Sequence, residues 1–349
     1  MKGYLSRPEV GTAIVAAAIV LVVSVWQIAT TDSVLTLDYS QLPSSQGWTY
    51  KPSFPREQSE RIAEIEKHLA TGADINAPLA GQDWTLLVTA ADRDASEVVA
   101  FLLERGADPN VTTDGDVTVS SPLSKAMWRQ DATIIEMLLK HGAKTDFTYG
   151  RKGEWNDTAL LDAIESNHPE LVELLLKYEA DVNLSPPNVG FTPLVAAVYY
   201  EWVSEQIVEL LLDNGADPNK AGRSAPSMFP LRSAVGKRDL STIKLLIKHG
   251  ADVNQSFAIH VAVQSATDDV VSYLAQVRGA DINHNPGFQG NAPLHLAAMK
   301  GRLKAAKVLM QHGADPSLKN EDGQTPLDIA RQQGRAELVK LLQGASSES

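Results

Sequence analysis

A five-residue phrase recurs along this chain of 349 residues and limits what the chain can fold into. Full copies begin Gly-Ala-Asp and start at Gly72, Gly106, Gly215, Gly250, Gly279 and Gly313, and weaker copies start at Gly142 and Glu179. Successive copies are separated by 34, 36, 37, 36, 35, 29 and 34 residues. A fixed period of this length predicts a stack of similar units, and proteins built in this way usually function by binding.

Two helical segments precede the turn in each period. The first has its clearest starts at Thr192-Pro193 and Thr325-Pro326. Because the Thr hydroxyl can cap free backbone N–H groups and Pro fits the first helical position, each pair predicts a helix start. The second segment, for example residues 171–176, repeats apolar residues at helical spacing and needs a neighbouring layer to cover them. The Gly of the turn then suits the left-handed conformation that ends a helix.

These motifs and their period resemble the ankyrin-repeat family. The resemblance implies an all-α solenoid of helix-turn-helix repeats with short β-hairpin fingers, extending over residues 56–343. We expect a lone capping helix at about 57–70, eight helix pairs, and a C-terminal tail at 344–349. The expected starts of the eight pairs lie at residues 85, 121, 158, 192, 229, 257, 292 and 325.

The N-terminal region predicts a membrane anchor. Residues 10–29 contain no charged side chain, and 20 residues suffice to cross a hydrocarbon core as a helix. A cleaved signal peptide is the alternative, but its apolar region is usually shorter and ends at a small-residue cleavage site, which is missing here. Residues 30–55 are rich in Ser, Thr, Pro and Gln and indicate a linker.

The charges that flank this segment predict its orientation. Lys2 and Arg7 precede the span, whereas Asp32 and Asp38 follow it. The positive-inside tendency places the tail of residues 1–9 in the cytoplasm and the repeats on the other side, most simply in the periplasm of a bacterium with the anchor in the inner membrane. The absence of cysteine is compatible with an oxidising compartment.

The sequence predicts no catalytic, cofactor or metal site. The eight histidines lack the spacing of metal ligands, and nucleophile and phosphate-loop motifs are absent. We expect His141, His249 and His312 to contact the last carbonyl groups of their helices. His260 and His295 occupy a position where the family resemblance implies hydrogen bonds between neighbouring repeats. The least favoured alternative is an enzyme whose site lies in an elongated finger at 146–157.

Charge favours a protein partner. The formal net charge of −12 opposes binding to nucleic acid and favours a basic protein. The resemblance implies that a partner binds in the groove formed by the first helices and the fingers. Large aromatic and basic side chains dominate binding hot spots. On this basis the predicted groove contacts are Trp128, Arg129, Tyr199, Tyr200, Trp202 and Lys237, and the weaker finger contacts are Tyr149, Trp155, Phe191 and Phe288.

The sequence therefore predicts a membrane-anchored protein that binds another protein on the non-cytoplasmic side. A narrower form of this hypothesis is an immunity or protective factor that sequesters or inhibits one protein. The alternative is a scaffold that stabilises a membrane complex, in which small residues such as Gly11 and Ala16 help the anchor to pair with another helix.

Overall fold

The computed structural model describes residues 58–79, 83–114, 118–151, 157–186, 190–223, 228–265, 267–285 and 289–346. The chain divides into two units, residues 1–47 and 48–349, and all described residues lie in the second. The predicted tail, membrane span and linker at 1–55 lie outside the described residues. Every helix within the described ranges is too short or too polar to cross a membrane.

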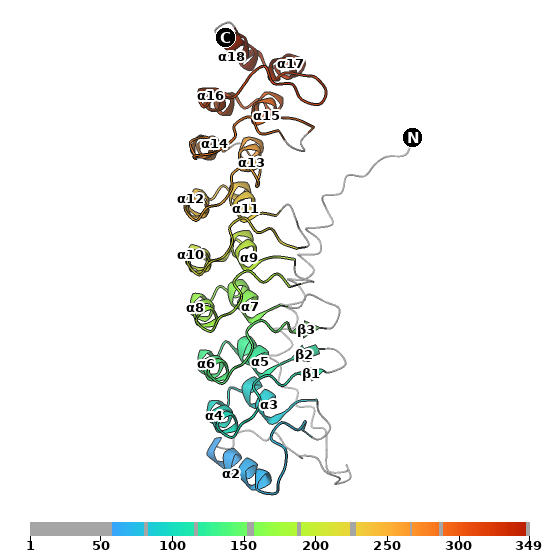
Figure 1. Cartoon of the computed structure of the whole chain (residues 1–349), viewed down its shortest axis with the longest axis vertical. Coiled ribbons are helices and arrows are strands. Elements are labelled where there is room, and N and C mark those ends of the chain that lie inside the picture. Colours follow the sequence, from blue (N-terminus) through green and yellow to red (C-terminus); the bar gives the residue numbers. More distant parts are fainter. Residues whose placement is uncertain are drawn as a thin grey trace, which may run out of the picture. The chain divides into compact units, whose positions relative to one another are not determined.

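The described part of the chain is a stack of helix pairs (Figure 1). A lone helix, α2, is followed by eight pairs in which the first helices form one row and the second helices a parallel row. The helices are α2 (Gln58–Leu69), α3 (Leu86–Asp92), α4 (Ser96–Glu104), α5 (Pro122–Arg129), α6 (Ala132–Lys140), α7 (Ala159–Glu165), α8 (Pro169–Lys177), α9 (Pro193–Tyr199), α10 (Glu205–Asp213), α11 (Pro230–Lys237), α12 (Leu240–Lys248), α13 (Ala258–Gln264), α14 (Asp268–Ala275), α15 (Pro293–Lys300), α16 (Leu303–Gln311), α17 (Pro326–Gln332) and α18 (Ala336–Ser346).

The first helices begin where the sequence predicts. The eight N-cap residues are Thr85, Ser121, Thr158, Thr192, Phe229, Phe257, Ala292 and Thr325. The hydroxyl oxygen of Thr192 accepts a hydrogen bond from the N–H of Val195, and Pro193 occupies the first helical position. In the sixth repeat Phe257 replaces the Thr-Pro pair and adopts a left-handed backbone with φ of +53°. The last helix, α18, continues to Ser346, three residues beyond the predicted repeat boundary.

The core runs continuously through the stack because each helix pair is too thin to bury its own apolar face. In α8, Leu171, Val172 and Leu175 are buried against neighbouring helices. Full burial of one such side chain contributes roughly 1.5 to 3 kcal/mol. Stability therefore depends on contacts between adjacent repeats, and a change at one joint acts mainly on its neighbours.

The recurrent turns form a ladder of hydrogen bonds along the stack. Gly215 ends its helix with φ of +86°, which Gly adopts without steric cost. Four residues later, Asn219 accepts a hydrogen bond from the N–H of Asp252 at 2.7 Å and donates to the carbonyl oxygen of Gly250 at 2.9 Å. Asn110, Asn183, Asn254 and Asn283 make the same pair of bonds to the following turn. Each Asn thus joins two repeats.

The rung of this ladder at Asp146 is incomplete. Asp146 stands at the Asn position, where its carboxylate accepts the N–H of Asp181 at 3.0 Å but cannot donate a hydrogen bond. In the same joint Glu179 replaces the helix-ending Gly and has φ of +62°. The joint between the second and third repeats therefore lacks a donor and carries backbone strain.

The fingers include a small antiparallel sheet beside α3, α5 and α7 (Figure 1). Strand β1 (Thr113–Asp114) pairs with β2 (Thr118–Ser120), and β2 pairs with β3 (Gly150–Arg151). Tyr149 also forms a bridge with Asp157, which closes the base of the predicted elongated finger. This bridge places Tyr149 beside Asp157, just before the start of α7.

The prediction about helix-end histidines is confirmed for two of its three members, and the prediction about His260 and His295 is confirmed for both. His141 and His312 hydrogen-bond through Nδ1 to the carbonyl oxygens of Met137 and Val308, both at 2.8 Å. His260 bonds to the carbonyl oxygen of Asn291, and His295 bonds to those of two residues in the eighth-repeat finger. His249 instead lies 3.7 Å from a carboxylate oxygen of Asp213. These histidines have structural contacts that join helix ends or adjacent repeats.

Candidate functional site: an aromatic patch in the middle of the array

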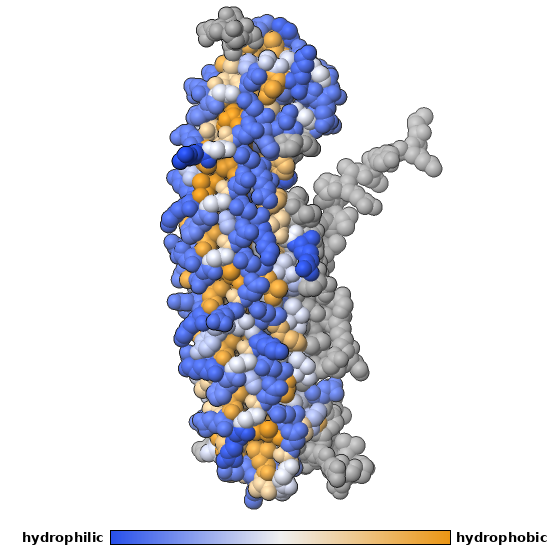
Figure 2. Space-filling view, viewed as in Figure 1, coloured by the Kyte–Doolittle hydropathy of each residue, from blue (hydrophilic) through white to orange (hydrophobic). Residues whose placement is uncertain are grey.

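Exposed aromatic side chains gather in the second and fourth repeats. Trp128 and Trp202 are each 57% exposed and Tyr199 is 39% exposed, whereas large apolar side chains elsewhere in the described residues are mostly covered. Hydrophilic side chains cover most of the face in Figure 2, with apolar side chains in narrow strips between them. The apolar surface of an exposed indole or phenol ring gains free energy when a partner covers it, so such rings indicate a contact surface.

An enlarged loop in the fourth repeat carries most of these rings. Five residues, Tyr200 to Ser204, connect α9 to α10, compared with two or three residues between the helices of each other pair. The loop bonds to the preceding repeat at three points. Trp202 donates its indole N–H to the carbonyl oxygen of Glu165 at 2.8 Å, and the Tyr200 hydroxyl donates to Oε1 of Glu165 at 2.9 Å. The N–H of Ser204 donates to Oδ1 of Asn167 at 2.8 Å. The loop is therefore preorganised.

The rings of this region contact one another in a row. Tyr200 and Trp202 stack with centroids 4.7 Å apart, Tyr199 meets Tyr200 edge to face at 5.6 Å, and Phe191 lies 5.3 Å from Tyr199. Such pairs add stability beyond the area that they bury. We call Phe191, Tyr199, Tyr200 and Trp202 the aromatic row. It combines a fixed, half-buried base with two exposed outer rings.

A partly buried carboxyl cluster lies beneath one end of this row. It consists of Asp157, Asp162 and Glu165 with two tyrosines. The Tyr149 hydroxyl donates to Oδ2 of Asp162 at 2.5 Å, in the same way that Tyr200 binds Glu165. These contacts connect the finger, α7 and the fourth-repeat loop.

Burial governs the protonation of this cluster. Burial, followed by the nearby charges of Glu165 and Asp162, raises the pKa of Asp157 to about 8. Burial likewise raises the pKa of Asp162 to about 6, against the lowering effect of the bond from Tyr149. The pKa of Glu165 is raised by burial and partly restored by the bond from Tyr200. Because like charges this close together disfavour one another, the cluster retains a proton near neutral pH.

Trp128 belongs to a separate cluster in the first two repeats. The buried ammonium group of Lys125 lies 4.1 Å from the ring centroid of Trp84 and 4.6 Å from that of Trp128. Burial lowers the pKa of Lys125, whereas Asp92 raises it. The predicted contact Arg129 is exposed, and its Nε donates to the carbonyl oxygen of Asp92 at 2.8 Å. One face of Trp128 therefore packs against the protein, and the other side remains accessible.

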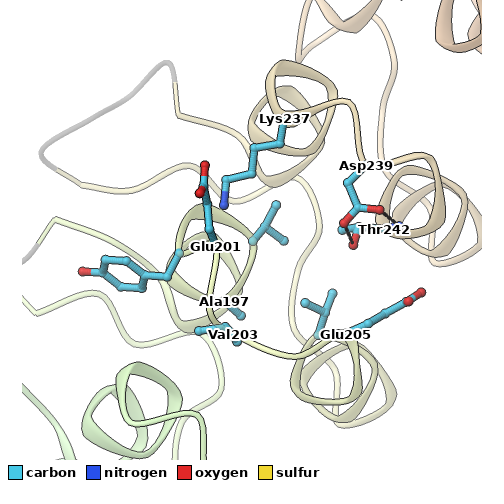
Figure 3. A pocket seen from close by; sticks show the side chains of 10 residues that line it. Ala197, Glu201, Val203, Glu205, Lys237, Asp239 and Thr242 are labelled. Atoms are coloured by element: carbon cyan, nitrogen blue, oxygen red, sulfur yellow. Dashed lines mark hydrogen bonds between the residues drawn. The ribbon is translucent and has the colours of Figure 1, made fainter.

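A cleft lies between the fourth-repeat loop and the fifth repeat (Figure 3). Its volume is about 220 Å³, and its lining is Ala197, Val198, Tyr200, Glu201, Val203, Glu205, Val208, Lys237, Asp239 and Thr242. The ammonium group of Lys237 extends toward Glu201 and lies 5.9 Å from the ring centroid of Tyr199. Burial lowers the pKa of Lys237, and the carboxylates of Glu201 and Asp239 oppose that effect.

The structure therefore unites only some of the predicted contact residues. Tyr199, Tyr200, Trp202 and Lys237 lie together, and Phe191 joins them as a half-buried ring. Tyr149 requires a correction: it is only 4% exposed, because its ring fills the space above Asp162 and its hydroxyl is bonded there. Its ring is not available to a partner at the surface.

Two of the predicted finger contacts cannot be placed. Trp155 and Phe288 lie outside the described residues. Within the described ranges, no group of three or more His, Asp or Glu side chains is arranged to hold a metal ion. The carboxyl cluster and the enlarged loop are the features that sequence reasoning missed. A usable signal for the loop was the longer spacing between the two helical segments of the fourth repeat.

Comparison with known proteins decides the family. A family model for ankyrin repeats in three copies matches residues 123–222 and 259–348, and a model for a single ankyrin repeat matches residues 82–114. The chain belongs to the ankyrin-repeat family. Ankyrin repeats mediate protein–protein interaction, and the proteins that carry them are typically interaction scaffolds without catalytic activity.

Its relatives share the repeats within longer proteins. The chain is 27% identical over 294 residues to the ankyrin repeat and KH domain-containing protein mask-1 of Caenorhabditis elegans, covering 74% of this chain and 11% of that protein. It is 37% identical over 102 residues to the BTB/POZ domain and ankyrin repeat-containing protein NPR5 of Oryza sativa subsp. japonica, covering 29% and 20%. This ankyrin-repeat chain thus spans a fifth or less of the length of either relative.

Among solved structures, the chain is similar to the ankyrin repeat domain of Bcl-3, described as a unique member of the IkappaB protein family. The sequence identity is 26% and the TM-score is 0.46, with 74% of this chain and 98% of the other covered.

Proposed function

We propose that this ankyrin-repeat protein binds a protein partner through the aromatic row and Trp128. The observation that carries the proposal is the exposure of Trp202 and Tyr199 on a loop and helix that are already fixed by hydrogen bonds and stacking. A preorganised ring loses little conformational entropy on binding, so burial of its surface converts efficiently into affinity. Neither exposed ring is needed to cover the core between the repeats.

The test is a set of alanine substitutions in the full chain. Crosslinking in intact cells first identifies the bound protein. The variants Trp202→Ala, Tyr199→Ala and Trp128→Ala are then compared with Tyr273→Ala, which removes a partly exposed ring from α14 of the second row. We expect each of the first two variants to weaken binding by roughly tenfold or more. Melting curves should remain close to that of the wild type.

The proposal fails if Trp202→Ala and Tyr199→Ala retain full affinity. It also fails if they lower affinity only as much as Tyr273→Ala does, because the loss would then reflect a general effect of removing a ring. If Trp202→Ala loses its melting transition together with its affinity, Trp202→Phe takes its place. This variant keeps an aromatic ring but lacks the bond to Glu165.

We further propose that residues 10–29 anchor the chain in a bacterial inner membrane with the repeats in the periplasm. The uncharged run and its basic N-terminal flank support this arrangement. A tether would keep the aromatic row at high local concentration beside membrane or periplasmic proteins. Protease added to spheroplasts should remove the repeats. Full protection of the repeats while a periplasmic marker is digested would refute the topology.

The narrower proposal is sequestration of one partner in an immunity or protective role. An accessible binding surface on a tethered array supports it, since occupancy of such a surface can block the partner. The purified protein should then inhibit the partner's activity at equal molar amounts. Binding without any inhibition would instead favour the assembly scaffold.

A further inference from the structure

The cleft between the fourth and fifth repeats has the size of a site for one side chain. Its volume of about 220 Å³ is below the roughly 300 to 1,000 Å³ of small-molecule sites. Apolar side chains of Ala197, Val203 and Val208 line it on the helix side. Figure 3 shows Glu201 and Lys237 on one side of the opening and Glu205 and Asp239 on the other. An elongated side chain with a polar end fits this arrangement.

The charges of the lining favour a cation. Three carboxylates, from Glu201, Glu205 and Asp239, face one ammonium group, that of Lys237. Asp239 accepts bonds from the N–H groups of Ser241 and Thr242, and Glu205 accepts one from the hydroxyl of Ser241. Glu201 is exposed and, within the described part of the chain, has no hydrogen bond or ion pair closer than 4 Å. It is the carboxylate most available to a partner.

The aromatic rings beside the cleft also favour a cation. The chain's own Lys237 holds its ammonium group 5.9 Å from the centroid of Tyr199. A cation is attracted to the face of an aromatic ring, and the planar guanidinium of Arg also stacks on it. Tyr200, which lines the cleft, presents a second ring, and Trp202 stacks on it with the centroids 4.7 Å apart. Lys237 thus occupies a position that suits a basic side chain from outside.

We propose that the partner presents a basic segment, one Arg or Lys of which enters this cleft, pairs with Glu201 and displaces the ammonium group of Lys237 from Tyr199. The proposal rests on the proposed function and specifies the partner's chemistry. The formal net charge of −12 would also steer a basic segment toward the chain. An acidic or purely apolar segment would leave Glu201 facing a like charge or an apolar group.

The test uses short random peptides displayed on phage and selected on the full chain in mild detergent. The selected peptides should share an Arg or Lys. Affinity of a selected peptide should fall roughly tenfold or more in Glu201→Lys and several-fold in Glu201→Gln, and should rise in Lys237→Gln. Glu209→Lys is the matched control, because Glu209 is exposed on α10 but does not line the cleft. Melting curves check that each variant is folded.

The outcomes separate this inference from the proposed function. Selected peptides without a basic residue, or unchanged affinity in Glu201→Lys, would overturn the basic segment while Trp202→Ala still abolished binding. An equal loss in Glu209→Lys would show a general charge effect and would also overturn it. If Trp202→Ala and Tyr199→Ala left peptide binding intact, the proposed function itself would fail. Recovery of no binding peptide would count against both.

Discussion

Replacement of Asp157 by Asn should stabilise the array relative to the wild type by an amount that grows as the pH rises. Burial and two neighbouring carboxyl groups raise the pKa of Asp157 from its ordinary value of 3.8 to about 8 in the folded protein. The folded chain therefore keeps this proton at pH values where the unfolded chain has released it. Asn has nearly the same shape and carries no titrating proton, so it keeps the packing and removes the cost of ionisation.

The sign and size follow from proton linkage. Between pH 3.8 and about 8 the folded state binds more protons at this site than the unfolded state does, so the free energy of unfolding falls as pH rises. One such group changes that free energy by about 1.4 kcal/mol per pH unit. The advantage of Asp157→Asn over the wild type should thus grow by about 2 to 3 kcal/mol from pH 5 to pH 7. Above the folded pKa the difference should become constant.

Urea unfolding of the full chain in mild detergent, followed by circular dichroism at several pH values, measures this difference. Asp269→Asn, at an exposed aspartate in the first turn of α14, serves as the control and should keep the pH dependence of the wild type. A constant difference between Asp157→Asn and the wild type from pH 5 to pH 8 would refute the assignment of a folding-linked proton to Asp157.

The incomplete rung and the ladder give three further predictions, each measured by urea unfolding. Asp146→Asn should stabilise the array by about 1 kcal/mol, since the new amide can donate to the carbonyl oxygen of residue 179; equal or lower stability would show that this bond does not form. Glu179→Gly should add about 1 kcal/mol by relieving the left-handed backbone, and a loss would mean that the Glu side chain matters more than the strain. Asn219→Ala should cost about 2 kcal/mol, because two bonds between repeats disappear; a change below 0.5 kcal/mol would contradict the role given to the ladder.

The sequence was sufficient for the helices because their ends are encoded locally. Thr192 and Thr325 cap their helices by contacts within a few residues, and the turn Gly needs only its own backbone freedom. The eight helix starts and the repeat order could therefore be predicted without knowledge of tertiary contacts. Even Phe257, which departs from the Thr-Pro pattern, begins its helix at the predicted position.

The site was harder to predict because its properties depend on contacts between repeats. Asp162 and Glu165 look like ordinary polar positions of a short helix. They become partly buried only when Tyr149 folds in from the finger and Tyr200 reaches across from the next repeat. For the same reason Tyr149 could not be recognised as a core residue, since its place in an elongated finger suggests exposure. Trp202 was correctly placed at the surface, but its bond to the backbone of Glu165 was not foreseeable.

The anchoring of the fourth-repeat loop on Glu165 has a mechanical consequence. The rings offered to a partner belong to one repeat, whereas the atoms that hold them in place belong to the repeat before it. Separation of these two repeats would scatter the rings, and a ligand that requires them side by side would resist that separation. A bound partner should therefore slow local opening between the third and fourth repeats and leave the opening of distant repeats unchanged.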